Sequence, residues 1–101
     1  MILRWTDRAR RDLLAIGRYM ARDNPAAARQ WVERLRERAR QAATTPQAGR
    51  MVPELRREDI REVFLRTYRI VYRVREQTID VLTVFEAHCR FDTTDLPELD
   101  R

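Results

Sequence analysis

The spacing of apolar residues along the chain changes its period near residue 60. Before that point, apolar side chains recur every three or four positions over residues 7–22 and 25–44, as they do on one face of an amphipathic helix. Beyond it, apolar and aromatic residues alternate with polar ones or run together, as they do in strands. The segments with strand character are Ile60–Leu65, Tyr68–Arg75 and Ile79–Glu86, and a fourth, Ile2–Trp5, precedes the first helix. The pattern predicts the order β-α-α-β-β-β.

Capping and turn residues indicate where these elements begin and end. Thr6 is a good helix N-cap, and Asp23-Asn24-Pro25 ends one helix and starts the next, since proline is tolerated in the first helical turn. Such a short connection predicts an antiparallel helical hairpin. A loop is expected over residues 44–53, and the charged residues 54–59 fit either a connection or the start of a strand. Near the end of the chain, Asp92-Thr93-Thr94-Asp95 favours a short final helical turn, and the alternative is an acidic tail that folds back on the basic face in place of a partner.

These elements predict an α+β fold in a single domain over residues 1–101. The last two strands should form a hairpin, and Ile60–Leu65 should pair on the other side of Tyr68–Arg75, which gives a mainly antiparallel sheet. The helical hairpin is expected to pack its apolar stripes against one face of this sheet and so to form the core. The nearly continuous apolar character of Ile79–Glu86 predicts a central strand that is covered on both faces. The position of the N-terminal strand in the sheet is left open.

The chain carries an excess of positive charge, and this charge is unevenly distributed along the sequence. All 21 basic residues are arginine, against 16 acidic residues, so the net charge is +5 without a single lysine. Residues 92–101 carry four acidic side chains and one arginine, which leaves a net charge of +8 on residues 1–91. A basic body of this kind favours a polyanion or an acidic protein segment as partner. A solvated arginine-rich surface without a partner is the alternative.

The composition excludes several kinds of chemistry. No lysine is present to serve as a base or nucleophile with a depressed pKa, and two glycines are too few for a glycine-rich phosphate loop. One histidine and one cysteine supply too few ligands for a metal site, so neither a metal nor a cofactor is expected. The lone cysteine excludes an internal disulfide, and no apolar run reaches the length of about 18 residues that a membrane span requires. We therefore expect a cytoplasmic protein without a membrane partner.

The best candidate for a functional surface is a set of arginines in the C-terminal half. Alternation along Tyr68–Arg75 places Arg69, Arg73 and Arg75 on one face, which predicts a half-buried strand with a basic outer face. Guanidinium groups bind phosphates and carboxylates through paired hydrogen bonds, so the set suits an RNA backbone or an acidic protein helix. Solvent-facing arginines without any partner are the alternative. The residues that could converge there are Arg61, Arg66, Arg69, Arg73 and Arg90.

The single histidine, His88, follows the last predicted strand. Near arginines, an imidazole can act as a general acid or base. A nucleophilic pair with Cys89 would require the two side chains to face each other, whereas neighbours on an extended segment point to opposite sides. An ordinary structural or surface role is the alternative. Tyr68 and Tyr72 share one strand face and are expected in the core, although a base-stacking platform would show the same spacing.

Four stretches of the chain resemble the RelE/ParE toxin superfamily of bacterial toxin–antitoxin operons. They are ILRWTDRARRDLLAIGRYMARDNPAAARQWVERL, TTPQAGRMVPEL, IREVFLRTYRIVYRV and IDVLTVFEAHCRF, in this order across nearly the whole chain. The likeness is closer to ParE, a branch once called plasmid stabilisation proteins. It implies the β-α-α-β-β-β fold and a ParD-like antitoxin whose acidic C-terminal segment folds on the toxin. It also implies inhibition of DNA gyrase by binding, without chemistry of the toxin's own and without a cofactor.

The RelE branch of the superfamily implies an alternative, a ribosome-dependent mRNA endoribonuclease, and only there would direct contact with nucleic acid be expected. Such cleavage relies on clustered basic residues, commonly lysines, and on a C-terminal tyrosine or histidine. Lysine is absent here and no tyrosine follows Tyr72, which disfavours cleavage. The catalytic residues of the alternative would be Arg61, Arg73 and His88. The gyrase hypothesis needs no catalytic residue and takes Arg61, Arg69, Arg73, His88 and Arg90 as antitoxin- and target-binding residues.

Overall fold

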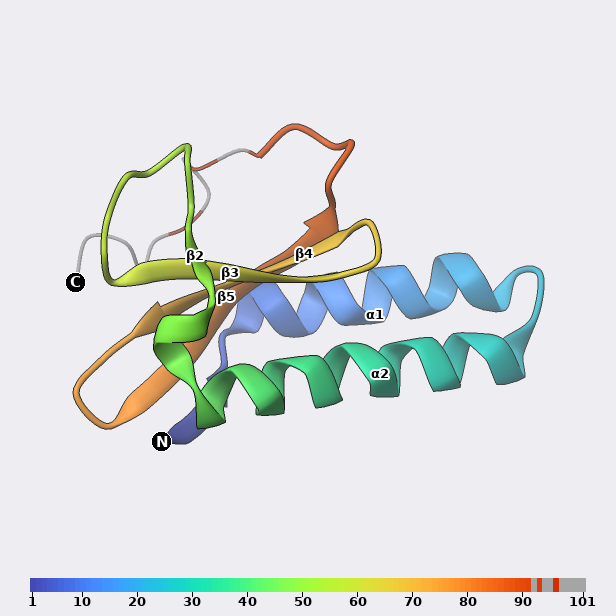
Figure 1. Ribbon diagram of the computed structural model, residues 1–101. Coiled ribbons are helices and arrows are strands. Elements are labelled where there is room, and N and C mark those ends of the chain that lie inside the picture. Colours follow the sequence, from blue (N-terminus) through green and yellow to red (C-terminus); the bar gives the residue numbers. More distant parts are fainter. Residues whose placement is uncertain (92, 94–95, 97–101) are drawn as a thin grey trace.

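The computed structural model describes residues 1–91, 93 and 96. The chain begins with a short strand, β1 (Ile2–Trp5), and continues with two helices, α1 (Asp7–Ala21) and α2 (Pro25–Thr44). The remaining elements are a single 3-10 turn, η1 (Pro46–Ala48), and the strands β2 (Arg50–Met51), β3 (Ile60–Leu65), β4 (Tyr68–Val74) and β5 (Thr78–Glu86). Figure 1 shows the two helices side by side along one face of the sheet. The helical turn expected over residues 92–95 falls outside the described residues, apart from Thr93.

The strands form one five-stranded sheet in the order β1-β5-β4-β3-β2. Neighbouring strands are antiparallel except for β1, which pairs in parallel with β5 and takes the sheet edge that the pattern left open. The predicted α+β fold is confirmed. The loop expected over residues 44–53 is wrong in part, because it contains η1 and β2. A two-residue edge strand has no periodicity that a sequence pattern can detect.

The predicted caps fix the positions of both helices. The hydroxyl of Thr6 accepts a hydrogen bond from the backbone N–H of Ala9 at 3.2 Å and donates to the carbonyl of Val81 at 2.8 Å. It therefore caps α1 and also ties the junction of β1 and α1 to the neighbouring strand β5. The side chain of Asn24 accepts from Ala27 N–H, and Pro25 occupies the first turn of α2, as expected.

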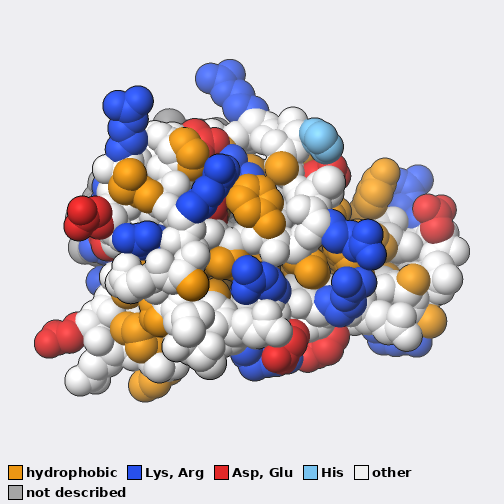
Figure 2. All heavy atoms as spheres, in the orientation of Figure 1, with side chains coloured by type: hydrophobic (Ala, Val, Ile, Leu, Met, Phe, Trp, Pro, Cys, Tyr) orange, Lys and Arg blue, Asp and Glu red, His pale blue; other side chains and the backbone are white. Residues whose placement is uncertain are grey.

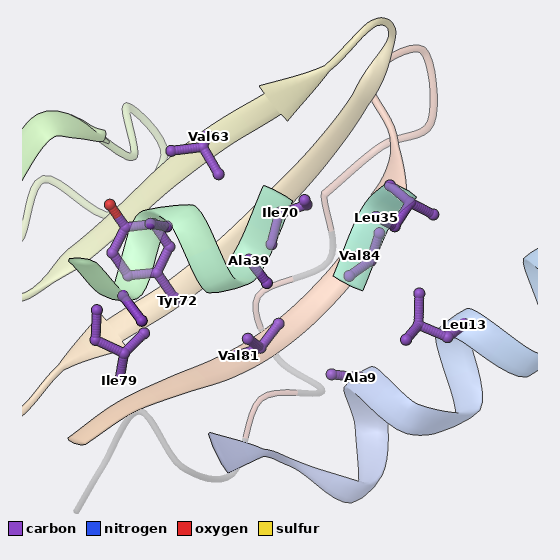
Figure 3. Packing of buried hydrophobic residues seen from close by; sticks show 12 residues of the cluster. Ala9, Leu13, Leu35, Ala39, Val63, Ile70, Tyr72, Ile79, Val81 and Val84 are labelled. Atoms are coloured by element: carbon purple, nitrogen blue, oxygen red, sulfur yellow. The ribbon is translucent and has the colours of Figure 1, made fainter. Parts of the chain in front are cut away.

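The core lies between the helical hairpin and the sheet (Figure 3). The residues that Figure 3 labels there are Ala9, Leu13, Leu35, Ala39, Val63, Ile70, Tyr72, Ile79, Val81 and Val84. A second, smaller cluster covers the opposite face of the sheet and consists of Val52, Ile60, Val71, Leu82 and Leu96, with Leu55, Phe85 and Phe91 packed against it. The central position of β5 and its cover on both faces are thus confirmed. We call the face away from the helices the outer face.

Gly49 allows the chain to cross close to the core tyrosine Tyr72. The Tyr72 hydroxyl donates to the carbonyl of Pro46 at 2.8 Å, and a Cβ atom on Gly49 would lie 2.1 Å from that hydroxyl. Burial raises the pKa of the Tyr72 phenol, so it stays a hydrogen-bond donor at neutral pH. Tyr72 is therefore a core residue, as expected, and it fixes the turn between α2 and β2.

None of the helices within the described residues is long and apolar enough to cross a membrane. In the same part of the chain, no group of three or more histidine, cysteine, aspartate or glutamate side chains is arranged to hold a metal ion.

Candidate functional site

The outer face carries arginines that pair with buried carboxylates. Glu62 on β3 is fully buried and accepts hydrogen bonds from Arg50 and from Arg69, the latter with an Nε to Oε1 distance of 2.6 Å. The two terminal nitrogens of Arg69 donate to both oxygens of Glu54, each at 2.8 Å. Arg69 itself is only 8% exposed, and its guanidinium lies 5.1 Å from the ring centre of Phe85. Its charge is thus satisfied within the chain.

Two further carboxylates bind arginines on the same face. Asp80, in the middle of the sheet, accepts from Arg4 at 3.2 and 3.0 Å and from Arg75 at 2.8 Å. Asp59 accepts from Arg57 at 3.0 and 2.8 Å and from Arg73 at 3.1 Å. Each pair of arginines thus shares one carboxylate, an arrangement that offsets the cost of burying the charge.

The prediction of a free basic outer face is therefore wrong for β4. Arg69 and Arg73 do project from that face, but the ion pairs with Glu62, Glu54 and Asp59 engage both of them. Alternation along β4 correctly predicted the face of the sheet from which these arginines project. It carried no information about carboxylates that approach from β3 and from the loop over residues 53–59.

The other predicted site residues lie in two separate places. Arg61 is half-buried near the start of β3, where it donates to the carbonyls of Gly49 at 3.0 Å and Glu58 at 3.1 Å. His88 and Arg90 follow β5 and are exposed, and the pale-blue His88 stands at the surface in Figure 2. The His88 side chain is 80% exposed, and its Nε2 lies 3.6 Å from a carboxylate oxygen of Glu86.

The three residues proposed for a nuclease do not come together. Arg61 lies opposite the core residue Tyr72, whereas Arg73 lies opposite Ile60 of the outer cluster, so the two arginines project from opposite faces of the sheet. Arg73 pairs with Asp80, while Glu86, which precedes His88, pairs with Tyr68. The two positions on β4, Tyr68 and Arg73, are five residues apart along the strand, which places them about 16 Å from each other. As they are placed in this structure, Arg61, Arg73 and His88 could not all contact the same phosphate.

A groove between α1 and α2 forms a second candidate site, which the sequence pattern did not reveal. Its volume is about 810 Å³. Its apolar lining comprises Trp5, Leu13, Leu14, Gly17, Ala21, Pro25, Ala28 and Val32. The charged residues along it are Arg10, Arg18, Arg29, Arg36 and Glu33. The groove thus combines an apolar floor with a mainly basic rim, as expected of a site for an acidic amphipathic segment.

Leu14 shows why the groove escaped the sequence pattern. An apolar residue beside Leu13 would be expected to widen the core-facing stripe of the helix, but the Leu14 side chain is 56% exposed and lines the groove instead. The structure corrects the expectation that the helical stripes are core throughout. A signal was present, because Leu14 stands next to Leu13 on a helix whose other exposed positions are mostly charged.

Comparison with known proteins identifies the family. Residues 3–88, from β1 to His88, match the family model described as "ParE toxin of type II toxin-antitoxin system, parDE". This chain belongs to the ParE toxin family. It is therefore a toxin of the type II toxin–antitoxin class, and the resemblance suggested by the sequence is confirmed.

Individual relatives of this ParE toxin agree with that assignment. The chain is 38% identical over 88 residues to "Putative toxin Y4kP" of Sinorhizobium fredii (strain NBRC 101917 / NGR234), a match that covers 85% of this chain and 88% of that protein. A solved structure titled "Chromosomal ParDE TA system from P. aeruginosa" matches with a TM-score of 0.73 and 24% identity, over 87% of this chain and 97% of that one. At this identity the structural match supports the fold.

Acid is expected to weaken the ion-paired outer face of this ParE toxin. Hydrogen bonds from Arg69 hold the pKa of Glu54 below its ordinary value of 4.5, although partial burial opposes the shift. A carboxyl with a lowered folded-state pKa stabilises the fold above its unfolded pKa, and this contribution is lost as the pH falls through the folded value. The free energy of unfolding should therefore decline below about pH 4.5, and less steeply in Glu54→Gln than in the wild type.

Urea unfolding between about pH 3 and pH 6 measures this difference. Glu58→Gln, which removes an exposed carboxylate from the same loop, is the matched control and should leave the slope unchanged. Parallel curves for Glu54→Gln and the wild type would contradict the assigned role of Glu54.

Proposed function

We propose that this ParE toxin inhibits DNA gyrase by binding to it and that a ParD-like antitoxin holds it inactive. The observation that supports the proposal is the separation of Arg61, Arg73 and His88, the three residues that the nuclease alternative would use. Inhibition by binding needs only a complementary surface. Membership of the ParE family supports the same choice.

The groove between α1 and α2 is the proposed seat of the antitoxin. Helix α1 has 15 residues and would be about 22 Å long, so the groove can accept an amphipathic helix of several turns. Apolar side chains of that helix would contact Leu14, Ala28 and Val32, while its acidic side chains would meet the arginines of the rim. An antitoxin segment that is acidic and folds on binding has this chemistry.

The proposal predicts that the purified toxin inhibits supercoiling by gyrase and that Arg90→Ala weakens the inhibition by about tenfold, as loss of one charged contact worth about 1.4 kcal/mol would do. Arg90 is exposed, and no ion pair is seen for it among residues 1–91, so its removal should leave the fold intact. A supercoiling assay measures the effect, and circular dichroism checks the fold. Unchanged supercoiling at saturating toxin, together with codon-phased cuts in mRNA on translating ribosomes, would instead establish the nuclease.

A further inference from the structure

The turn between β3 and β4 holds an arginine in a backbone conformation that arginine rarely adopts. Leu65 pairs with Tyr68, so Arg66 and Thr67 alone form the turn. Arg66 has a φ of 51°, in the left-handed region where glycine and asparagine are favoured. An arginine therefore costs conformational free energy at this position. Its side chain is exposed, and no ion pair with a residue of the described chain offsets that cost. Strain of this kind can be retained where a side chain has a role outside the fold, and the surroundings of Arg66 distinguish it from Arg56, which has the same φ.

The segment after β5 lies beside this turn. The backbone N–H of Ala87 donates to the carbonyl of Thr67 at 2.6 Å, and Tyr68 pairs with Glu86. The chain therefore leaves the sheet beside the turn, and His88 follows directly. In Figure 2, arginine side chains gather below the pale-blue His88 on this side of the molecule.

Helix α2 adds two more arginines to the same end of the sheet. Arg38 donates to the carbonyl of Phe64 at 3.1 Å, just before the turn. Arg34 lies over the ring of Trp31 at 4.9 Å, and that ring meets Tyr68 edge to face with centres 5.9 Å apart. We call the three residues Arg34, Arg38 and Arg66 the basic end.

The basic end differs from the group of arginines on the outer face. On the outer face, Arg69, Arg73 and Arg75 bind carboxylates, whereas no ion pair of the basic end appears within residues 1–91. The basic end also contributes no residue to the lining of the groove between α1 and α2. It is therefore a separate surface that retains its positive charge.

We propose that the basic end is the surface by which the toxin contacts its target protein, and that Arg66 binds a carboxylate of the target. The inference rests on the proposed function and assigns it a surface apart from the antitoxin groove. A protein carboxylate fits this patch because a guanidinium binds a carboxylate through paired hydrogen bonds, as Arg69 binds Glu54 within the chain. Moreover, the rings of Trp31 and Tyr68 pack against each other, so they do not form an open stacking platform.

The substitution Arg66→Asn tests the proposal without disturbing the turn, since asparagine tolerates the left-handed conformation better than arginine. We expect at least a tenfold rise in the toxin concentration that half-inhibits gyrase supercoiling. The affinity for the antitoxin should stay within twofold of wild type, and the melting temperature should be equal or higher. Arg56→Asn is the matched control, because Arg56 has the same φ of 51° and is exposed in the loop at the other end of β3. It should inhibit like the wild type.

Several outcomes would overturn the inference. Full inhibition by Arg66→Asn, or an equal loss in Arg56→Asn, would show that the position of the charge is unimportant. Binding of duplex DNA by the toxin alone, measured by fluorescence anisotropy and lost in Arg66→Asn, would assign the basic end to nucleic acid instead. If the wild-type toxin leaves gyrase active, the proposed function fails. The same variants are then compared by whether their expression arrests cell growth. Loss of growth arrest in Arg66→Asn but not in Arg56→Asn would support the basic end as the target-binding surface. Equal growth arrest by the wild type and both variants would reject it.

Discussion

Replacing Glu62 with alanine is expected to lower the free energy of unfolding by about 3–5 kcal/mol, the usual cost of removing one partner from a buried ion pair. The Glu62 carboxylate is fully buried between Arg50 and Arg69. Without it, Arg69 keeps its ion pair with Glu54, but its Nε–H loses its acceptor on a side chain that is only 8% exposed. The change also leaves a cavity under the loop that Glu54 anchors to the sheet.

Urea unfolding at pH 7 measures this loss, with Glu37→Ala as the matched control. Glu37 also pairs with an arginine, Arg40, at 2.8 Å, but its side chain is 55% exposed. Exposed pairs of this kind contribute about 0–1 kcal/mol. Glu37→Ala should therefore lower the free energy of unfolding by less than Glu62→Ala does. Equal losses in the two variants would mean that the buried network of the outer face contributes no more than surface pairs.

The sequence pattern was sufficient to predict the two helices and the strands other than β2, because each of these elements depends on local chemistry. Thr6 and Asn24 cap their helices by hydrogen bonds to residues three positions away, and these can be read from neighbours in the chain. The change of period near residue 60 likewise follows from which face of each strand is buried. These local rules placed both helices and the three long strands within one or two residues.

Contacts between distant residues could not be predicted in this way. The pairing of β1 with β5 joins residues 76 positions apart, and Arg4 meets Asp80 over the same separation. The sequence therefore showed arginines on β4 but not the carboxylates that neutralise them. The left-handed backbone of Arg66 was also invisible, since no glycine or asparagine marks that turn. These are the features that move the candidate surface from the outer face to the groove and the basic end.

If the groove and the basic end are separate surfaces, binding of the antitoxin to the groove does not by itself block contact with the target. If the antitoxin occupies the groove and the target meets the basic end, a short segment in the groove alone leaves the basic end open. Complete neutralisation then requires either a longer antitoxin segment that continues along α2 toward Arg34 and Arg38, or exclusion of the large target by the bulk of the antitoxin. The two surfaces can accordingly be inactivated one at a time.

Leu14→Glu is expected to weaken binding of the antitoxin at least 100-fold, a loss of about 2.7 kcal/mol, while gyrase inhibition stays unchanged. Leu14 contributes the exposed apolar surface of the groove, and a glutamate there would repel an acidic segment as well as remove an apolar contact. The side chain already faces solvent, so the fold should tolerate the change. Isothermal titration calorimetry with the cognate antitoxin measures the affinity, and the supercoiling assay measures inhibition.

The control Ala15→Glu separates the groove from a general effect of charge. Ala15 is exposed on the same helix, next to Leu14, but does not line the groove. It adds the same negative charge and should weaken binding by no more than about threefold, because a charge outside the contact is screened by solvent. Equal losses in both variants would mean that net charge rather than the groove governs recognition. Loss of gyrase inhibition in Leu14→Glu alone would mean that the target and the antitoxin share the groove, and the two surfaces would then be one.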